Sequence, residues 1–95
     1  MSVSAAYPNP VICRGGEGCS VHVDLQSACP KEIHWVVMTT AYRKMAGGSA
    51  LVSGKLTVAW DLKDQRGAPV ADGMYYFMIK TDGGAWKRVP LVVLR

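Results

Sequence analysis

The stretch that decides the fold of this chain is Val58-Ala-Trp-Asp-Leu-Lys-Asp-Gln-Arg-Gly-Ala-Pro-Val-Ala-Asp-Gly-Met-Tyr75. An apolar run ends in Trp60-Asp61, charged and small residues follow, and a second apolar run opens at Tyr75 after Asp72-Gly73. Alternating apolar runs that are separated by Asp, Gly and Pro are typical of strands joined by a tight loop. The stretch therefore predicts a strand, a polar loop and a second strand.

The same pattern continues outward in both directions. We expect strands over residues 7–12, 19–25, 32–42, 50–53, 54–61, 74–81 and 86–94, with a break at 27–31, a turn at 43–48, a loop at 47–49 and a hairpin turn at 82–84. No segment predicts a helix. About seven short strands at this spacing indicate an all-β, antiparallel β-sandwich. We expect one domain over residues 1–95, in which residues 1–6 are a linker or a cloning remnant.

The alternation of apolar and polar residues also predicts which side chains form the core. The expected core residues are Val21, Val23, Ile33, Trp35, Val37, Leu56, Val58, Trp60, Tyr75, Phe77 and Ile79. Pro8 and Pro10 lack a backbone donor, which places the first strand at a sheet edge, and Pro90 indicates the same for part of the last strand.

Composition narrows the class of protein. The 95 residues are 49% hydrophobic and 19% charged, as in an ordinary globular domain. The net charge is +4, but the basic residues are scattered rather than gathered on one element, so we expect no nucleic-acid partner. No apolar stretch approaches the ~20 residues that span a bilayer, and the first residues do not resemble a signal peptide. We therefore expect no membrane insertion.

Three cysteines lie in the first third of the chain. Cys13 and Cys19 bracket Arg-Gly-Gly-Glu-Gly, which is flexible enough to bring them together. A bond between them would close a loop of about seven residues and contribute roughly 2–2.5 kcal/mol in the chain-entropy formula. We favour this disulfide, with three reduced thiols as the alternative. The spacing is not Cys-x-x-Cys, and we expect no metal site.

Catalytic groups are weakly indicated. Asp61 and Asp64 lie in a short turn, where carboxylates commonly cap loop N–H groups. His22 and His34 fall on expected strands, and Cys29 lies in a Cys-Pro-Lys turn without the surroundings of a nucleophile. We therefore expect no catalytic residue, no cofactor and no enzymatic activity.

Several motifs together resemble a known family. These are Gly54-Lys-Leu-Thr-Val-Ala-Trp60-Asp61, Asp64-Gln-Arg-Gly67, Asp72-Gly73-Met-Tyr75, an early Tyr7-Pro8-Asn9-Pro10 and a short apolar-basic end at Pro90–Arg95. Over residues 6–95 the chain resembles the immunoglobulin-like domain of the FlgD flagellar hook-capping family. It is equally similar to C-terminal domains of secreted bacterial proteins, including type IX secretion sorting domains. Leu62 and Tyr42 stand at or near positions where the family commonly has glycine.

The resemblance implies an immunoglobulin-like sandwich in which these motif residues have structural roles. Trp60 buries its ring, Gly67 and Gly73 take positive φ, and Tyr75 bonds a neighbouring loop as a tyrosine corner does. It also implies a structural, assembly or sorting module at the C-terminal end of an exported bacterial protein. Such a module would act outside the cell or at its surface through protein partners, namely secretion or assembly machinery or neighbouring domains.

A carbohydrate- or surface-binding module on the same sandwich is the alternative. Exposed aromatic rings in a line would favour it. Tyr76 is the best candidate, because it alternates with the inward residues Tyr75 and Phe77. Trp35 and Trp86 are expected to pack in the core or on a sheet face.

Overall fold

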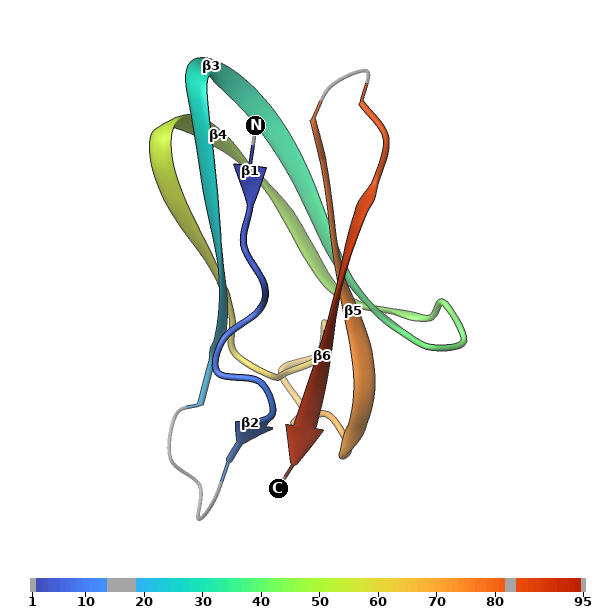
Figure 1. Ribbon diagram of the computed structural model, residues 1–95. Coiled ribbons are helices and arrows are strands. Elements are labelled where there is room, and N and C mark those ends of the chain that lie inside the picture. Colours follow the sequence, from blue (N-terminus) through green and yellow to red (C-terminus); the bar gives the residue numbers. More distant parts are fainter. Residues whose placement is uncertain (1, 14–18, 82–83, 95) are drawn as a thin grey trace.

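The computed structural model describes residues 2–13, 19–81 and 84–94 (Figure 1). Within these ranges every regular element is a strand. The strands are β1 (Ser2–Val3), β2 (Val11–Ile12), β3 (Val21–Thr39), β4 (Lys44–Trp60), β5 (Gly73–Thr81) and β6 (Lys87–Leu94). The predicted all-β sandwich is confirmed. The described part of the chain contains no helix that is long and apolar enough to cross a membrane.

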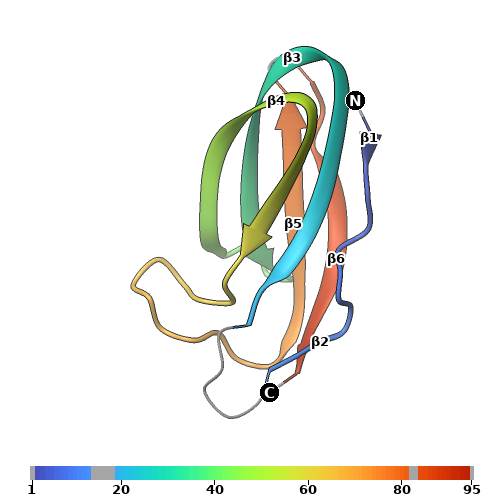
Figure 2. The same ribbon diagram turned by 90° about the vertical axis from the view of Figure 1, so that its left-hand side faces the viewer.

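The two layers arise because β3 and β4 are long and bend together. Residues 21–27 of β3 pair with residues 54–60 of β4, and β1 lies beside them. Beyond a register shift between Ser27 and Lys31, the second half of β3 pairs with the first half of β4 and with β5, followed by β6 and β2. Figure 2 shows both long strands arching over at the top of the molecule. The ring of Trp60 meets that of Tyr75 edge-on at 5.5 Å between centroids, which joins the two layers across the core.

The bend corrects two expectations about β3 and β4. The predicted break at 27–31 is a bend within one strand, although Pro30 lies there. The predicted turn and loop at 43–49 are wrong, because β4 already begins at Lys44. Gly47 and Gly48 pair with Val36 and Trp35, and a Cβ on Gly48 would lie 2.9 Å from the indole nitrogen of Trp35. Glycine therefore makes room for a ring on the neighbouring strand rather than forming a loop.

The core follows the predicted alternation. All the expected core residues are buried except Trp35 and Leu56, which are partly buried and pack against the core. The buried side chains that the pattern did not single out are Ala6, Val11, Cys13, Leu25, Val52, Leu62, Val70, Val89, Leu91 and Val93. Three of them lie on β6, two in or directly after β2, and two in the loop after β4.

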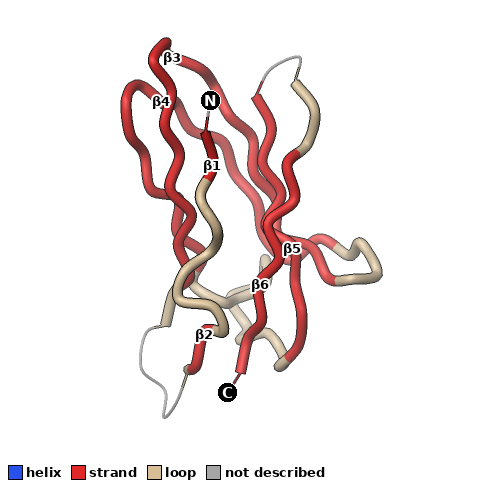
Figure 3. Tube along the Cα trace, in the orientation of Figure 1, coloured by secondary structure: helices blue, strands red, loops and turns tan. Residues whose placement is uncertain are grey.

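The N-terminal segment belongs to the sandwich. The expectation of a linker over residues 1–6 is wrong for the described residues, because Ser2 and Val3 pair with β3 and Ala6 is buried. The expected single strand at 7–12 is also divided: Tyr7 forms an isolated bridge with β3, and β2 runs parallel to β6. Two prolines interrupt the ladder between them because proline cannot donate. Figure 3 shows this stretch as a loop between β1 and β2. Residues 82–83 of the predicted hairpin turn lie outside the described residues.

Candidate functional site

The loop between β4 and β5 uses its polar groups to hold its own shape. The indole N–H of Trp60 donates to the Lys63 carbonyl at 3.0 Å. Asp61 accepts from the Lys63 N–H at 3.2 Å. Asp64 Oδ1 accepts from the backbone N–H groups of Arg66 and Ala68 at 2.8 and 3.0 Å. Both carboxylates therefore act as caps within the loop, as their turn position predicts.

The end of the same loop is fixed by Tyr75. Its hydroxyl donates to the Ala71 carbonyl at 2.5 Å, which is the contact expected of a tyrosine corner. Gly67 and Gly73 have φ angles of 82° and 149°, in a region that L-residues with a Cβ rarely adopt. Asp72 is exposed and directly precedes Gly73. This motif thus closes the loop onto the core.

Two residues, Tyr42 and Leu62, share an unusual backbone conformation. Tyr42 has φ 63° and Leu62 has φ 61°, both in the left-handed region. Tyr42 lies in the turn between β3 and β4, and its N–H donates to the Thr39 carbonyl at 2.9 Å. The two side chains differ in environment: Leu62 is fully buried, whereas Tyr42 is 61% exposed. Glycine would adopt this backbone at a lower conformational cost at both sites.

The Tyr7–Pro10 motif ties the N-terminal segment to both layers. Tyr7 exchanges two backbone hydrogen bonds with His22, at 2.9 and 2.8 Å, and its ring stacks on the His22 imidazole at 5.5 Å. Two residues later the Asn9 side chain accepts from the Val92 N–H at 3.0 Å and donates to the Pro90 carbonyl at 3.3 Å. The motif crosses from β3 in one layer to β6 in the other.

A polar groove lies beside this segment on the outer face of the first layer. Its volume is about 480 Å³, and it is lined by Ser2, Val3, Ser4, Tyr7, Asp24, Leu25, Gln26, Lys55, Leu56 and Thr57. Asp24 Oδ1 accepts from the hydroxyls of Thr57 and Tyr7, each at 2.7 Å. These bonds lower the pKa of Asp24, and the hydrogen bond to the Asp24 carboxylate raises the pKa of Tyr7.

The groove was not predicted as a site. The alternation of β3 places His22 and Asp24 on one outward face, but pairing with Tyr7 depends on a segment far away in sequence. Asp24 is already bonded to two hydroxyls, and Ser4 Oγ accepts from its backbone N–H at 2.9 Å. The arrangement holds the N-terminal segment on the sheet.

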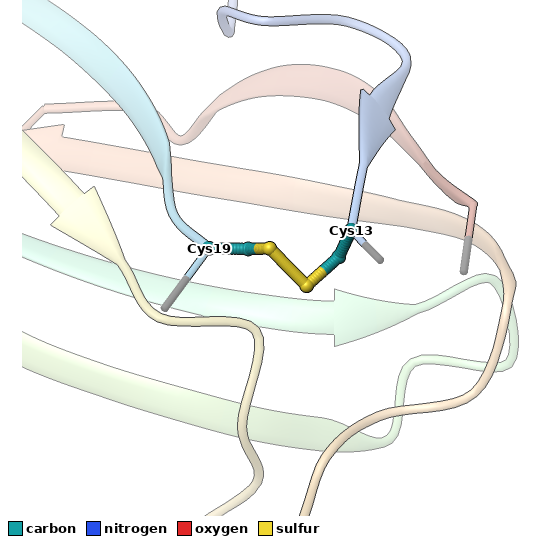
Figure 4. Close-up of a disulfide and its surroundings, with 2 residues drawn as sticks. All are labelled: Cys13 and Cys19. Carbon is teal, nitrogen blue, oxygen red and sulfur yellow. A yellow bond between two sulfur atoms is a disulfide. The ribbon is translucent and has the colours of Figure 1, made fainter. Parts of the chain in front are cut away.

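A disulfide joins Cys13 and Cys19, the pair favoured from the sequence (Figure 4). Cys13 directly follows β2, and Cys19 comes two residues before β3, so the bond links one strand from each layer. The Cys13 N–H also donates to the carbonyl of Leu94, the last residue of β6, at 2.8 Å. Cys29 is exposed and has a free thiol. Over the described residues, no three His, Cys, Asp or Glu side chains gather where they could hold a metal ion.

Two aromatic rings lie in the region of β5 and β6. Tyr76 is on the outer face of β5, and Trp86 lies in the segment that leads into β6. The Arg88 guanidinium lies over the half-buried ring of Tyr76, 4.8 Å from its centroid. The Lys80 ammonium lies over Trp86, at 5.1 Å. The expectation that Trp86 packs in the core or on a sheet face is not met, because 44% of its surface is exposed. Trp86 precedes β6, where it is covered by a lysine rather than by another layer.

These features define the class of this protein: it is an immunoglobulin-like β-sandwich whose N-terminal segment crosses between the two layers. One solved structure of similar fold is PorZ, an essential bacterial surface component of the type-IX secretion system of Porphyromonas gingivalis. The match has a TM-score of 0.68 and 23% sequence identity, and it covers 95% of this chain. This chain spans only 11% of the length of PorZ. No protein-family model and no curated protein matches the sequence. At this identity the likeness establishes the fold.

Proposed function

We propose that this chain is a non-catalytic module that serves the export or surface assembly of a bacterial protein through protein–protein contacts. The module belongs at the cell surface or outside the cell, at the C-terminal end of a larger exported protein. Its partners are secretion or assembly machinery or neighbouring domains. We also propose that this chain is related to FlgD-like domains or to type IX secretion sorting domains.

The observation that carries this proposal is the likeness to a small part of PorZ, a surface component of a secretion system, over 95% of this chain. The polar groups of the motifs are consistent with it. Asp61 and Asp64 bond the backbone of their own loop, and Asn9 bonds β6. Residues that maintain the sandwich in this way leave the strand edges and outer faces for contact with a partner.

Deletion of this module from the full-length protein tests the proposal. We expect loss of export, surface retention or assembly, measured by cell fractionation, while any enzymatic turnover of the remaining protein is unchanged. A matched control replaces the module by an unrelated β-sandwich of similar size, which should not restore export. Normal localisation of the deleted protein would contradict the proposal, as would loss of turnover in a correctly located protein.

Carbohydrate or surface binding is a second candidate, favoured by the exposed ring of Trp86 and the half-buried ring of Tyr76. Both rings are accompanied by a cation, which would suit a glycan with acidic groups. A glycan array with the isolated chain tests this function, with Trp86→Ala and Tyr76→Ala as variants. Clear binding that both variants abolish would displace the first proposal.

A further inference from the structure

We propose that residues 46–52 of β4, here named the β4 edge, pair antiparallel with the same residues of a second copy of this chain. In the described part of the chain, β4 pairs with β3 alone, so its other side presents unpaired backbone N–H and C=O groups. Such a row is a template for strand addition. The inference deepens the proposed function, because it names one contact by which the module assembles.

The β4 edge lacks the usual protection against pairing. No charged residue and no proline occurs between Lys44 and Lys55, and Gly47, Gly48 and Ser49 are exposed. Leu51 has 64% of its surface exposed. Natural edge strands commonly carry lysine, proline or a bulge. The register from Ala46 to Val52 runs without a shift, so a bulge is also missing there.

The other outer strands of the described chain differ in this respect. β1 and β2 have two residues each, and Pro10 directly precedes β2. At one end of the β4 edge, residues 64–66 lie beside residues 43–45 around a hollow of about 230 Å³. At the other end the strand bends near Gly54, whose φ is 81°. These features bound the stretch at residues 46–52. Residues 54–60 of β4 also pair with β3 alone, but they carry Lys55, a charge of the kind that protects an edge.

A second copy fits this stretch because the sequence is complementary to itself. An antiparallel pair with its twofold axis at Ser49 places Leu51 of one copy opposite Gly47 of the other, and Ala50 opposite Gly48. In β4 these paired residues lie on the same face as each other, since their numbers differ by even steps. Leu51 would then lie over a residue without a side chain, close to Val36, which pairs with Gly47 within one copy.

Charge also permits this pairing. Each copy carries a net charge of +4, so two copies repel one another over most of their surfaces. In the proposed register the seven pairs contain no charged residue, so no like charges lie opposite one another within them. Lys44 of one copy lies opposite Gly54 of the other, next to Lys55, so the like charges lie beyond the two ends of the paired stretch. Seven residue pairs form a small interface, which predicts a weak dimer, with a Kd of roughly 100 μM.

Sedimentation velocity with this chain, from about 10 μM to about 1 mM, tests the proposal. We expect a reversible monomer–dimer equilibrium. Ser49→Lys places two lysines beside the twofold axis and should weaken the dimer at least about tenfold. Ala85→Lys adds the same charge in the exposed segment before β6 and should leave the dimer unchanged. Circular dichroism of both variants shows that the fold is kept. Amide signals of residues 46–52 should shift on dilution in NMR spectra.

A chain that is monomeric at the highest concentration overturns the inference, as does a dimer that Ser49→Lys and Ala85→Lys affect equally. The proposed function is judged separately by the export of the full-length protein. If Ser49→Lys dissociates the dimer but export is normal, the dimer stands and its role in export fails. If the chain is monomeric but deletion of the module abolishes export, the pairing fails and the function stands.

Discussion

Glycine substitutions at Tyr42 and Leu62 should have opposite effects on stability, although both residues have nearly the same backbone conformation, with φ of 63° and 61°. The left-handed region costs a residue with a Cβ about 1 kcal/mol or more, and glycine removes that cost. Glycine also gains entropy in the unfolded chain, which offsets about 0.4–1 kcal/mol. Tyr42 is 61% exposed, so little packing is lost. Tyr42→Gly should therefore stabilise the fold by about 0.5 kcal/mol and raise Tm by about 2–4 °C.

Leu62→Gly has the same backbone gain but loses a fully buried side chain. Removal of a buried leucine side chain costs about 2–5 kcal/mol, which exceeds the conformational gain. We expect a net loss of about 2–4 kcal/mol and a fall in Tm of about 10 °C or more. The difference between the two sites thus comes from burial, since the backbone term is common to both.

Thermal and urea unfolding of the two variants measure both effects, with Tyr42→Ala as the matched control. Alanine removes the same ring but keeps a Cβ in the left-handed region, so Tyr42→Gly should exceed Tyr42→Ala in stability by about 0.5 kcal/mol after the entropy of the unfolded chain is included. Equal stability of these two variants would refute the conformational argument. A Leu62→Gly variant as stable as the parent chain would refute the burial argument.

Three further predictions concern the N-terminal third of the chain and the strands that it contacts. Asn9→Ala removes two hydrogen bonds to β6 and should cost about 1–2 kcal/mol in urea unfolding, whereas Asn9→Asp keeps the acceptor and should cost less. Hydrogen bonds from Thr57, and to a smaller extent from Tyr7, lower the pKa of Asp24. The stability contributed by Asp24 should therefore be present above its unfolded-state pKa of about 3.9 and be lost as pH falls through the lower folded-state pKa. An NMR titration of the Asp24 carboxyl measures the folded-state pKa, and a midpoint that is not lowered contradicts the prediction. Alkylation without reduction should modify only Cys29, and three alkylated cysteines would exclude the disulfide. Replacement of both Cys13 and Cys19 by serine should lower the free energy of unfolding by about 2 kcal/mol.

Local pattern was sufficient to predict the sandwich and most of its core. Residues 21–25, 54–60 and 75–79 alternate strictly, and a one-residue slip in any of them would turn the buried set to solvent. The loop motif from Trp60 to Tyr75 was equally readable, because its hydrogen bonds join residues two to four apart. Short-range signals of this kind leave little freedom for another arrangement.

Contacts between distant segments could not be read in this way. Gly47 and Gly48 look like a loop, yet they lie in a strand because the Trp35 ring occupies the space where a Cβ would be. Ser2 and Val3 look like a linker, but their partners lie more than twenty residues later in β3. The Tyr7–Asp24 contact in the groove was missed for the same reason. In each case the deciding neighbour is supplied by the fold rather than by adjacent sequence.

The N-terminal crossover also explains why one side of the sandwich is left open. Tyr7 pairs with β3 on the side away from β4, and Asn9 bonds the backbone of β6. The segment from β1 to β2 thus covers the outer side of β3 in one layer and of β6 in the other (Figure 1). β4 is the outer strand at the opposite side of both layers, and no described segment adds to it. The residues that seal one side of the fold thus leave the outer side of β4 unpaired, and the β4 edge is the stretch of it without charge or proline, which is where a second strand can add.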